Sequence, residues 1–521
     1  MSVKSVISSV GVPGVRLAGD DVDLVGITVD SRAARPGYAW AALRGENAHG
    51  AQFAAQAIEQ GVSAILTDAD GERLIADLAL RADAMPVVAV CEDPRRMAAL
   101  WADVIHGHPS ASLPVIGVTG TNGKTSVTTM VARTLAHLGR AAGVVGTNGT
   151  FVLGTGGSER LIPTERTTPE ATDLHALLAL MRDDGVSAAA LEVSSHAMVL
   201  HRVEAVRFDQ VAFTNLSQDH LDFHADMEDY FLAKASLFTP EYARRAVICV
   251  DDEWGRRLAA LARVPVTTYA TSDAHPADYT VSAIEAGDFS TTFDVRDPEG
   301  RAWRLTSPLP GRHYVANTLA VALLLQGLGV QRETIAPAIA AAGTVPGRME
   351  LIASPAGAAQ SPRVVVDYSH TPDALDKTLT TLRELPGKGS LIAVIGAGGK
   401  RDAGKRPLMG EVASRLAQTV IVTDDNPRGE DAARIRAQVM AGATGGAHVS
   451  ECADRADAIA RAVVLADSDD IVLIAGKGAE SGQDLGDRVI DFDDREHAAA
   501  ALRSWVATRA ERGRNEGDPH A

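Results

Sequence analysis

The stretch IGVTGTNGKTS, from Ile116 to Ser126, decides the fold of this chain. An apolar run from Leu113 to Val118 precedes it, and a helix-forming run from Val127 to Leu138 follows it. A strand, a glycine-rich loop and a helix in this order direct backbone N–H groups and a helix N-terminus at one point, which suits a polyphosphate. The sequence therefore predicts a nucleoside triphosphate site.

The loop carries the side chains that such a site needs. Lys124 is expected to reach the β- and γ-phosphates, and the hydroxyl of Thr125 to hold Mg²⁺. The match to the phosphate-loop template is incomplete, because the template has glycine where Val118 stands and Gly117 lies one place early. A glycine-rich turn that merely contains a lysine is the alternative, and the flanking strand and helix make it the weaker one.

Size and composition limit the possible functions. The 521 residues are enough for about three domains of the usual ~100–200 residues. A formal net charge of −17 argues against general nucleic-acid binding, although a local basic pocket can still bind anions. The three cysteines form no CxxC pair, which is typical of reduced thiols in a cytoplasmic protein. With no targeting segment and no apolar run of ~20 residues, we expect no membrane association.

Three blocks are expected to form the domains 1–112, 113–345 and 346–521. In the second block, apolar runs at 188–193, 211–214 and 246–250 alternate with helical segments. This alternation predicts an α/β fold whose central, phosphate-loop sheet is mostly parallel with helices on both faces. The third block begins after a predicted hinge at Pro346-Gly347 and repeats the alternation, so a Rossmann-like α/β domain is expected there.

Polar side chains follow several of the predicted strands. Glu192 ends a buried strand, where it could hold Mg²⁺ or cap the following helix. The loop that contains His220 and His224 could bind a metal, although a solvated loop is the commoner outcome for such a cluster. Lys234 lies on a helical stretch among aromatic residues, and composition alone favours a surface lysine there. In the third block, four strand-end loops carry polar side chains, which predicts a second ligand-binding face: 367–373, 398–407, 424–428 and 475–480.

Together these motifs resemble those of the Mur ligases, ATP-dependent enzymes that add amino acids to the peptidoglycan precursor. The resemblance covers nearly the whole chain and rests on TGTNGKT (119–125), EVSSH (192–196), NLSQDHLD (215–222) and HTPDAL (370–375). The segment VDSR (29–32) is similar to the family's UDP-binding first domain. GKRPLMG (404–410) and DDNPR (424–428) are similar to the branch of the family that uses diaminopimelate.

The resemblance implies a reaction. Meso-diaminopimelate would be joined to the D-glutamate of UDP-N-acetylmuramoyl-L-alanyl-D-glutamate through an acyl phosphate, with ATP converted to ADP and phosphate. Mg²⁺ would be the cofactor. We expect a monomer in the cytoplasm that binds neither nucleic acid nor membranes.

The resemblance also implies roles for individual residues. It assigns ATP binding to Gly120, Thr121, Asn122, Gly123, Lys124, Thr125, Ser126, Asn317, Arg348, Asp367, Tyr368 and His370. It assigns the UDP-muramoyl-dipeptide to Ser31, Thr167, Thr168, Ser194 and Arg202, and diaminopimelate to Arg401, Asp425, Asn426, Arg428, Gly476 and Glu480. The catalytic residues would be Lys124, Glu192, His220 and Lys234, and the Mg²⁺ ligands would be Thr125, Glu192, His220 and Lys234 as a carbamate.

Selectivity for diaminopimelate requires a cation, because this amino acid differs from lysine by one extra carboxylate. Arginine suits that task, since its planar fork meets a carboxylate with two hydrogen bonds. Arg428 stands in a tight Asn-Pro-Arg turn and is the predicted residue. The alternative is that Asp425 and Arg428 form an ion pair that only stabilises the turn.

The chain departs from the usual family pattern in a few places, namely Leu200, His313, Tyr314, Lys400 and Ala479. These departures leave open a catalytically impaired, nucleotide-binding homologue. Another Mur-type or folylpolyglutamate-type ligase and a phosphate-loop kinase are further alternatives. Release of phosphate that requires both the dipeptide precursor and an amino acid, with an amide as product, distinguishes the ligase from the others.

Overall fold

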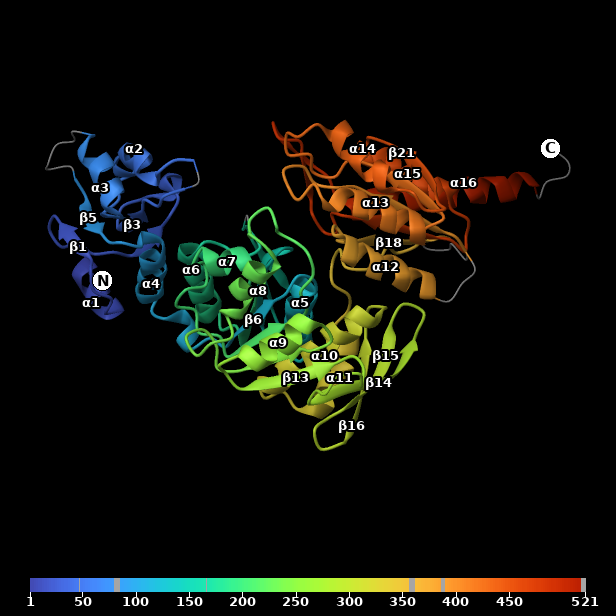
Figure 1. Ribbon diagram of the computed structural model, residues 1–521, viewed down its shortest axis with the longest axis horizontal. Helices are drawn as coiled ribbons and strands as arrows, with labels where there is room; N and C mark the ends of the chain where they lie inside the picture. Colours follow the sequence, from blue (N-terminus) through green and yellow to red (C-terminus); the bar gives the residue numbers. More distant parts are fainter. Residues whose placement is uncertain (46, 79–84, 165, 356–360, 386–388, 517–521) are drawn as a thin grey trace.

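The computed structural model describes residues 1–45, 47–78, 85–164, 166–355, 361–385 and 389–516, with the backbone alone for 510–516. Three sheets with flanking helices follow one another along the chain, and each forms its own lobe in Figure 1. The predicted α/β fold with three domains is confirmed. Within the described residues, no helix is both long enough and apolar enough to cross a bilayer.

The N-terminal lobe is a small, mostly parallel sheet with the strand order β1-β5-β4-β3-β2. Its strands are β1 (Arg16–Ala18), β2 (Gly26–Thr28), β3 (Tyr38–Ala41), β4 (Ala64–Thr67) and β5 (Val87–Val90), and its helices are α1 (Val3–Val10), α2 (Ala54–Glu59), α3 (Ala69–Ala76) and α4 (Pro94–Ile105). The sequence explains where α4 begins. The carboxylate of Asp93 caps the helix by accepting a hydrogen bond from the backbone N–H of Arg96 at 3.0 Å, and Pro94 stands in the first turn, where proline is favoured. Helix α4 also contacts a helix of the central lobe, so it joins the two.

The central lobe contains an eleven-stranded sheet with the order β16-β15-β14-β13-β12-β11-β6-β10-β7-β8-β9. Its strands are β6 (Val115–Thr119), β7 (Ala142–Gly146), β8 (Gly149–Leu153), β9 (Glu159–Ile162), β10 (Ala188–Glu192), β11 (Gln210–Phe213), β12 (Ala246–Cys249), β13 (Val266–Ala270), β14 (Tyr279–Ala286), β15 (Thr291–Arg296) and β16 (Ala302–Ser307). The strands from β7 to β14 in this order are parallel, and an antiparallel hairpin extends each edge.

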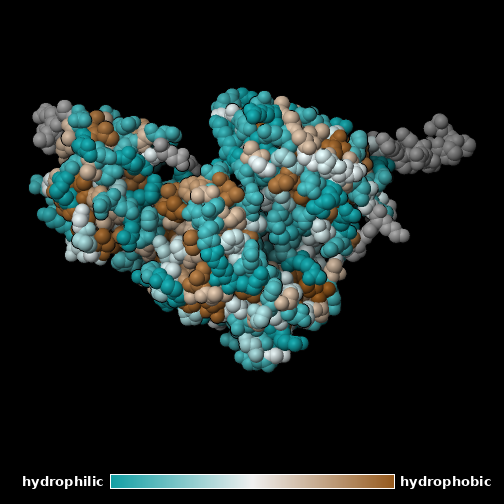
Figure 2. Space-filling model, in the orientation of Figure 1, coloured by the Kyte–Doolittle hydropathy of each residue, from teal (hydrophilic) through white to brown (hydrophobic). Residues whose placement is uncertain are grey.

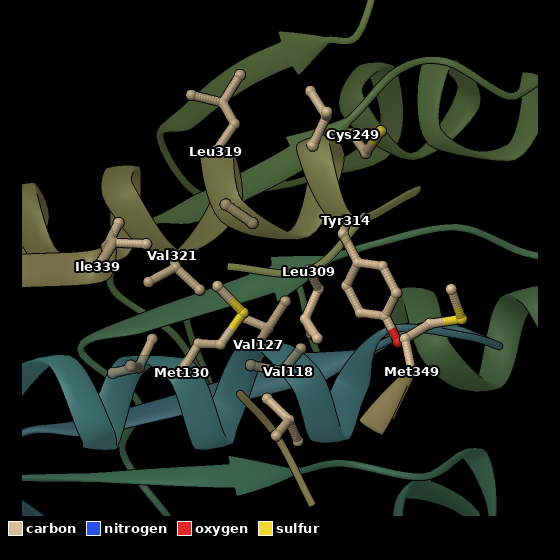
Figure 3. Close-up of a cluster of buried hydrophobic side chains, with 14 of the residues drawn as sticks. Val118, Val127, Met130, Cys249, Leu309, Tyr314, Leu319, Val321, Ile339 and Met349 are labelled. Carbon is tan, nitrogen blue, oxygen red and sulfur yellow. The ribbon is translucent and has the colours of Figure 1, made fainter. Parts of the chain in front are cut away.

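Helices cover both faces of the central sheet, as predicted. One face carries α5 (Lys124–His137), α10 (Arg312–Gly327) and α11 (Arg332–Ala341), and the other carries α6 (Ala171–Asp183), α7 (Ser195–Val199), α8 (Met227–Ala235) and α9 (Glu253–Leu261). Because side chains alternate along a strand, Val118 of β6 points to the first face and Val115 to the second. Figure 3 shows Val118 beneath α5, and Val127 and Met130 of α5 packing against α10.

The C-terminal lobe has a six-stranded sheet with the order β17-β18-β22-β19-β20-β21, parallel except at β17. Its strands are β17 (Glu350–Leu351), β18 (Arg363–Asp367), β19 (Leu391–Ile395), β20 (Thr419–Val422), β21 (His448–Glu451) and β22 (Ile471–Ala475), and a separate hairpin pairs β23 (Gly482–Asp484) with β24 (Val489–Asp491). Helices α12 (Pro372–Glu384), α13 (Lys405–Leu416) and α14 (Ala432–Gly442) cover one face, and α15 (Arg455–Leu465) and α16 (Asp494–Glu516) the other. In open α/β sheets, ligands bind at the carboxyl ends of the parallel strands, and we call this edge of each larger sheet its ligand edge.

A fully buried ion pair fastens the helices α15 and α16 to the ligand edge of this sheet. The guanidinium of Arg455 donates to both carboxylate oxygens of Asp494 at 2.7 Å, and neither side chain is exposed. Arg455 also donates to the carbonyls of Asp424 and Ala475, at 3.3 and 3.0 Å. One arginine therefore holds the ends of β20 and β22 together.

We expect Asp494→Ala to destabilise the C-terminal lobe by about 3–5 kcal/mol, because it strands a buried guanidinium without its counter-ion. The measurement is urea unfolding together with hydrogen exchange of the β20 and β22 amides. Asp467→Ala is the matched control, because Asp467 forms an exposed pair with Arg509 at 2.7 Å. It should cost about 0–1 kcal/mol. Equal losses in the two variants would contradict the prediction.

Candidate functional site

The glycine-rich loop between β6 and α5 has the backbone of a phosphate loop. Gly120 and Gly123 adopt φ angles of 142° and 92°, which side-chain-bearing residues rarely reach. The ammonium of Lys124 donates to the carbonyls of Gly120 and Thr121 at 3.0 and 2.8 Å, so it lies folded over the loop. Gly117 has a different purpose, because a Cβ there would lie 2.9 Å from the ring of Phe208.

The neighbouring strand β11 holds this loop in place. The backbone N–H of Thr121 donates to the carbonyl of Asn215 at 2.9 Å, and the N–H of Asn122 donates to the Asn215 side chain at 3.0 Å. The hydroxyl of Thr214 donates to the carbonyl of Asn122 at 2.6 Å. The loop is therefore preorganised by residues almost a hundred positions further along the chain.

Lys234 is buried behind the same loop, so the surface position favoured by composition is wrong. Only 1 % of the residue is exposed, and its ammonium donates to the carbonyl of Gly120 at 3.0 Å and lies 4.6 Å above the ring of Tyr230. In the part of the chain that the structure describes, no carboxylate forms an ion pair with it. Burial, reinforced by the charge of Lys124, holds the pKa of Lys234 well below its usual value.

Glu192 is also buried, at the carboxyl end of β10. Its carboxylate accepts hydrogen bonds from the N–H and the hydroxyl of Thr147, at 2.8 and 3.0 Å. The alternative that it caps the following helix is wrong, because Ser194 caps α7 through the N–H of Ala197 at 3.1 Å. Glu192 therefore faces the cavity above the sheet.

The histidine-rich loop after β11 is partly buried rather than solvated. His224 is 3 % exposed and bonds to the hydroxyl of Ser195 at 2.8 Å and to the carboxylate of Asp229 at 3.0 Å. His220 faces the cavity with a φ of 56°, and desolvation lowers its pKa to about 3 in spite of Asp219 nearby. A neutral imidazole of this kind can act as a ligand.

The residues assigned to the dipeptide surround the Glu192 strand end. The hydroxyl of Thr168 donates to the carbonyl of Glu192 at 2.8 Å, and it accepts from the N–H of Ser194 at 3.3 Å. Arg202 donates to Glu170 at 3.1 Å. Thr167 bonds to the hydroxyl of Thr147 at 3.0 Å. All of these side chains except that of Glu170 line the cavity.

The C-terminal lobe reaches directly over the phosphate loop. Arg348 donates to the hydroxyl of Thr125 at 2.9 Å, and its guanidinium stacks 4.2 Å from the centre of the Tyr368 ring. The carboxylate of Asp373, at the start of α12, accepts hydrogen bonds from Asn122 at 2.9 Å and from Ser217 at 3.3 Å.

The linker between the central and C-terminal lobes, Pro346-Gly347, contacts both of these lobes. Asn148 donates to the carbonyl of Pro346 at 2.9 Å. Gly347 has a φ of 65°, and a Cβ on it would lie 2.1 Å from the backbone nitrogen of Ala479. Only glycine therefore lets the linker pack on the loop that follows β22.

The loops after β20 and β22 face each other across the ligand edge of the C-terminal sheet. Asn426 donates to the carboxylate of Glu480 at 3.0 Å. Arg428 is half-buried with a φ of 50°, and its side chain reaches the carbonyl of Gly399 at 3.4 Å. Among the described residues, Asp425 and Arg428 form no ion pair, so the turn-stabilising alternative is not supported.

One cavity of about 490 Å³ brings these loops together. It contains nearly all the predicted site residues: Thr121, Asn122, Gly123, Lys124, Thr125, Ser126, Thr167, Thr168, Glu192, Ser194, Arg202, His220, Lys234, Asn317, Arg348, Asp367, Tyr368, His370, Arg401, Asp425, Asn426, Arg428, Gly476 and Glu480. Gly120 contributes through its carbonyl, which receives both lysines. Ser31 is the exception and lines a second cavity of about 930 Å³ between the N-terminal and central lobes.

The two cavities share Arg166, which lines both of them. Figure 2 shows a notch in the upper outline of the molecule between the N-terminal and C-terminal lobes, with both hydrophobic and hydrophilic residues below it. A ligand that extends from Ser31 to the phosphate loop could therefore pass from the second cavity to the first.

Several known proteins are similar to this chain over nearly its whole length. The UDP-N-acetylmuramoyl-L-alanyl-D-glutamate–2,6-diaminopimelate ligase of Streptomyces coelicolor is 45% identical over 496 residues, which cover 94% of each chain. A ligase of the same name from Xanthomonas campestris is 44% identical over 492 residues, which cover 94% of this chain and 96% of that protein.

The chain belongs to the Mur ligase family.

Three segments match the family's own sequence models. Residues 23–97 match the Mur ligase catalytic domain, residues 118–325 the Mur ligase middle domain, and residues 347–478 the glutamate ligase domain. A solved structure of a UDP-N-acetylmuramoyl-L-alanyl-D-glutamate–2,6-diaminopimelate ligase is 30% identical, with a TM-score of 0.63 over 94% of this chain and 95% of that one. A folylpolyglutamate synthase of Mycobacterium tuberculosis shares the fold alone, at 19% identity and a TM-score of 0.58 over 79% of this chain and 94% of that one.

Sequence reasoning missed two lysines of this Mur ligase site. Lys405 begins α13 and is 9 % exposed; burial lowers its pKa, and no hydrogen bond or ion pair of its side chain is present among the described residues. Lys477 is fully buried between Asn426 and Glu480. Lys405 follows Gly404 in the segment 404–410, and Lys477 follows Gly476 in the strand-end loop 475–480, so a lysine directly after a glycine was the available signal.

Proposed function

We propose that this Mur ligase uses ATP to join meso-diaminopimelate to the D-glutamate carboxylate of UDP-N-acetylmuramoyl-L-alanyl-D-glutamate. The observation that carries the proposal is the single cavity in which a phosphate loop and an Asn-Pro-Arg loop face each other. Relatives at 44–45% identity that are named for this reaction support it. The enzyme would work as a monomer in the cytoplasm, with a role in cell-wall synthesis.

The proposed division of labour follows the three lobes, with boundaries near residues 112 and 345. The cavity at Ser31 would hold the UDP part, and its continuation past Arg166 would carry the muramoyl-dipeptide to Thr168 and Ser194. ATP would occupy the loop of Lys124 and the neighbouring residues of both lobes. The amino acid would lie at the C-terminal sheet edge.

The chemistry demands activation, because a carboxylate is a poor acyl donor at neutral pH. An oxygen of the D-glutamate carboxylate attacks the γ-phosphorus, the bond to ADP breaks, and an acyl phosphate forms. The neutral amine of the amino acid then attacks the acyl carbon, phosphate leaves with the electrons of the C–O bond, and the nitrogen releases one proton to give the amide. The protein contributes positions and cations for these steps. Lys124 and Arg348 flank Thr125 and would offset the charge of two anionic reactants.

The residues present fit Mg²⁺ as the cofactor. Within the described residues, no group of three or more His, Cys, Asp and Glu side chains could hold a metal alone. Mg²⁺ usually takes one or two carboxylates together with substrate phosphates and water. Thr125, Glu192 and His220 would hold it beside the nucleotide. When bound, Mg²⁺ would neutralise phosphate charge.

Lys234 would complete this site as a carbamate. A neutral amine is the form that reacts with carbon dioxide, and burial favours that form. The product is an anion, whereas an ammonium in the same place would repel a metal ion. The absence of an ion-pair partner for Lys234 among the described side chains agrees with a lysine that is not held as a cation.

The deciding experiment measures phosphate release with the UDP-muramoyl-dipeptide and each of a panel of amino acids. We expect release that requires both the dipeptide and an amino acid, with diaminopimelate preferred and an amide as product. Nucleotide binding without release would favour an impaired homologue. Preference for another amino acid would redefine the substrate; one relative, from Leifsonia xyli, 41% identical over 94% of this chain and 93% of that protein, is named only as a UDP-N-acetylmuramyl-tripeptide synthetase.

Lys124→Ala should abolish ligation while the fold remains intact. Among the described residues, the ammonium donates its hydrogen bonds to two loop carbonyls, so little packing is lost, but the charge that would face the transferred phosphoryl group disappears. We expect phosphate release to fall at least about 100-fold. Far-ultraviolet circular dichroism checks the fold, and unchanged release would refute the nucleotide assignment.

Lys234→Ala should lose ligation and regain part of it with added short carboxylic acids such as acetate or propionate. The vacated space would admit a carboxylate in place of the carbamate. Lys124→Ala is the matched control, since its missing group is a cation that no acid replaces. If acids restore neither variant, the carbamate proposal fails.

Arg428→Ala should raise the KM for diaminopimelate at least roughly tenfold, since a lost charge-assisted hydrogen bond costs roughly 1.5–3 kcal/mol. The wild type should use lysine poorly. Arg434→Ala is the control, because Arg434 is exposed on α14 and does not line the cavity. Equal use of lysine and diaminopimelate by the wild type would refute the assignment.

A further inference from the structure

Lys477 closes a triangle of hydrogen bonds at the far end of the amino-acid pocket. Its ammonium donates to the side-chain oxygen of Asn426 at 2.9 Å and to Oε2 of Glu480 at 3.1 Å. Asn426 completes the triangle by donating its amide N–H to the same Oε2 at 3.0 Å. Lys477 itself is fully buried, whereas the Glu480 side chain is 31% exposed. The glutamate thus faces the cavity with one oxygen already occupied.

Neighbouring backbone groups hold the three side chains of this triangle in place. The backbone N–H of Asp484 donates to the same Asn426 oxygen at 2.9 Å, which fixes the orientation of the amide. Gly476 has a φ of 121°, and a Cβ on it would lie 2.7 Å from Oδ2 of Asp425. The bare glycine therefore lets the second carboxylate come close to the loop that carries Lys477.

The charges of the two facing loops, 425–428 and 476–480, balance. They contribute the carboxylates of Asp425 and Glu480 and the cations of Arg428 and Lys477. The segment after β19 adds Arg401, Asp402 and Lys405 to the same lining. Without Lys477, the two facing loops would carry one net negative charge next to Glu480.

We propose that Lys477 is a specificity-determining positioning residue, which offsets the charge of Glu480 so that this end of the pocket accepts a zwitterionic amino-acid end and rejects a lone ammonium. This inference rests on the proposed function. The distal end of diaminopimelate bears one ammonium and one carboxylate, so it matches two loops whose charges balance. The distal end of lysine bears only an ammonium, and the buried charge of Lys477 repels it. Lys477 does not touch the substrate and acts through Glu480 and Asn426.

The test compares three amino acids whose distal ends differ in charge. Diaminopimelate is neutral overall at that end, L-lysine is positive and L-2-aminopimelate is negative. We expect Lys477→Met to lower the ratio of kcat/KM for diaminopimelate over lysine at least about tenfold, which equals about 1.4 kcal/mol. The change should appear in KM, and use of L-2-aminopimelate should fall further.

Two companion variants separate charge from packing. Lys477→Arg keeps the cation and should retain the preference for diaminopimelate over lysine. Lys477→Met combined with Glu480→Gln restores the charge balance of the two loops, so its ratio should return toward that of the wild type even though overall affinity drops. A merely structural lysine would lower kcat for all three amino acids and leave the ratios unchanged, in which case the inference is wrong.

Folding and the proposed function are checked separately. Hydrogen exchange of the β22 amides reports whether each variant is folded, and Lys477→Gln replaces Lys477→Met if the latter is not. If the wild type releases no phosphate with diaminopimelate, the proposed function fails. If it does, and both uncharged variants keep the wild-type ratio, this inference alone fails.

Discussion

The approach of two parallel sheets, carboxyl end to carboxyl end, is the constraint on which the rest of this Mur ligase depends. Arg348 reaches across to the hydroxyl of Thr125, and Asp373 receives the amide of Asn122. Each sheet alone presents strand-end loops with polar side chains, as many α/β sheets do. Only their apposition encloses a cavity where a phosphate donor and an amine could meet. The site is therefore a property of the interface between two lobes.

The lysines on the two sides of that interface have different partners. On the phosphate side, the ammonium of Lys124 is held by backbone carbonyls, which leaves its positive charge for anionic ligands. On the amino-acid side, Lys477 is paired with Glu480. The cost of partly burying a cation such as Lys124, which has no ion-pair partner among the described residues, is offset when an anionic ligand binds beside it. A buried cation that is already paired, such as Lys477, instead changes the net charge that the site presents to a ligand.

Much of this arrangement could be predicted from local sequence. The phosphate loop, the strands β10, β11 and β12, and the polar strand ends follow from hydrophobic patterns and glycine spacing. The burial of Lys234 could not, because its surroundings come from a loop more than a hundred residues earlier. The local sequence predicts the helix on which Lys234 lies, but it does not show which distant segments of the chain pack against that lysine. For Lys477 the motif was visible, but its partners lie on another strand end, and only the fold brings them together.

The contact between Gly347 and Ala479 joins two parts that are usually considered apart. The segment about which the C-terminal lobe would turn rests on the same loop that carries Lys477 and Glu480. A substitution that reshapes this loop to suit a different amino acid therefore also reshapes the surface on which the linker packs. Exchange of this loop between relatives would carry over selectivity only if the linker were exchanged with it.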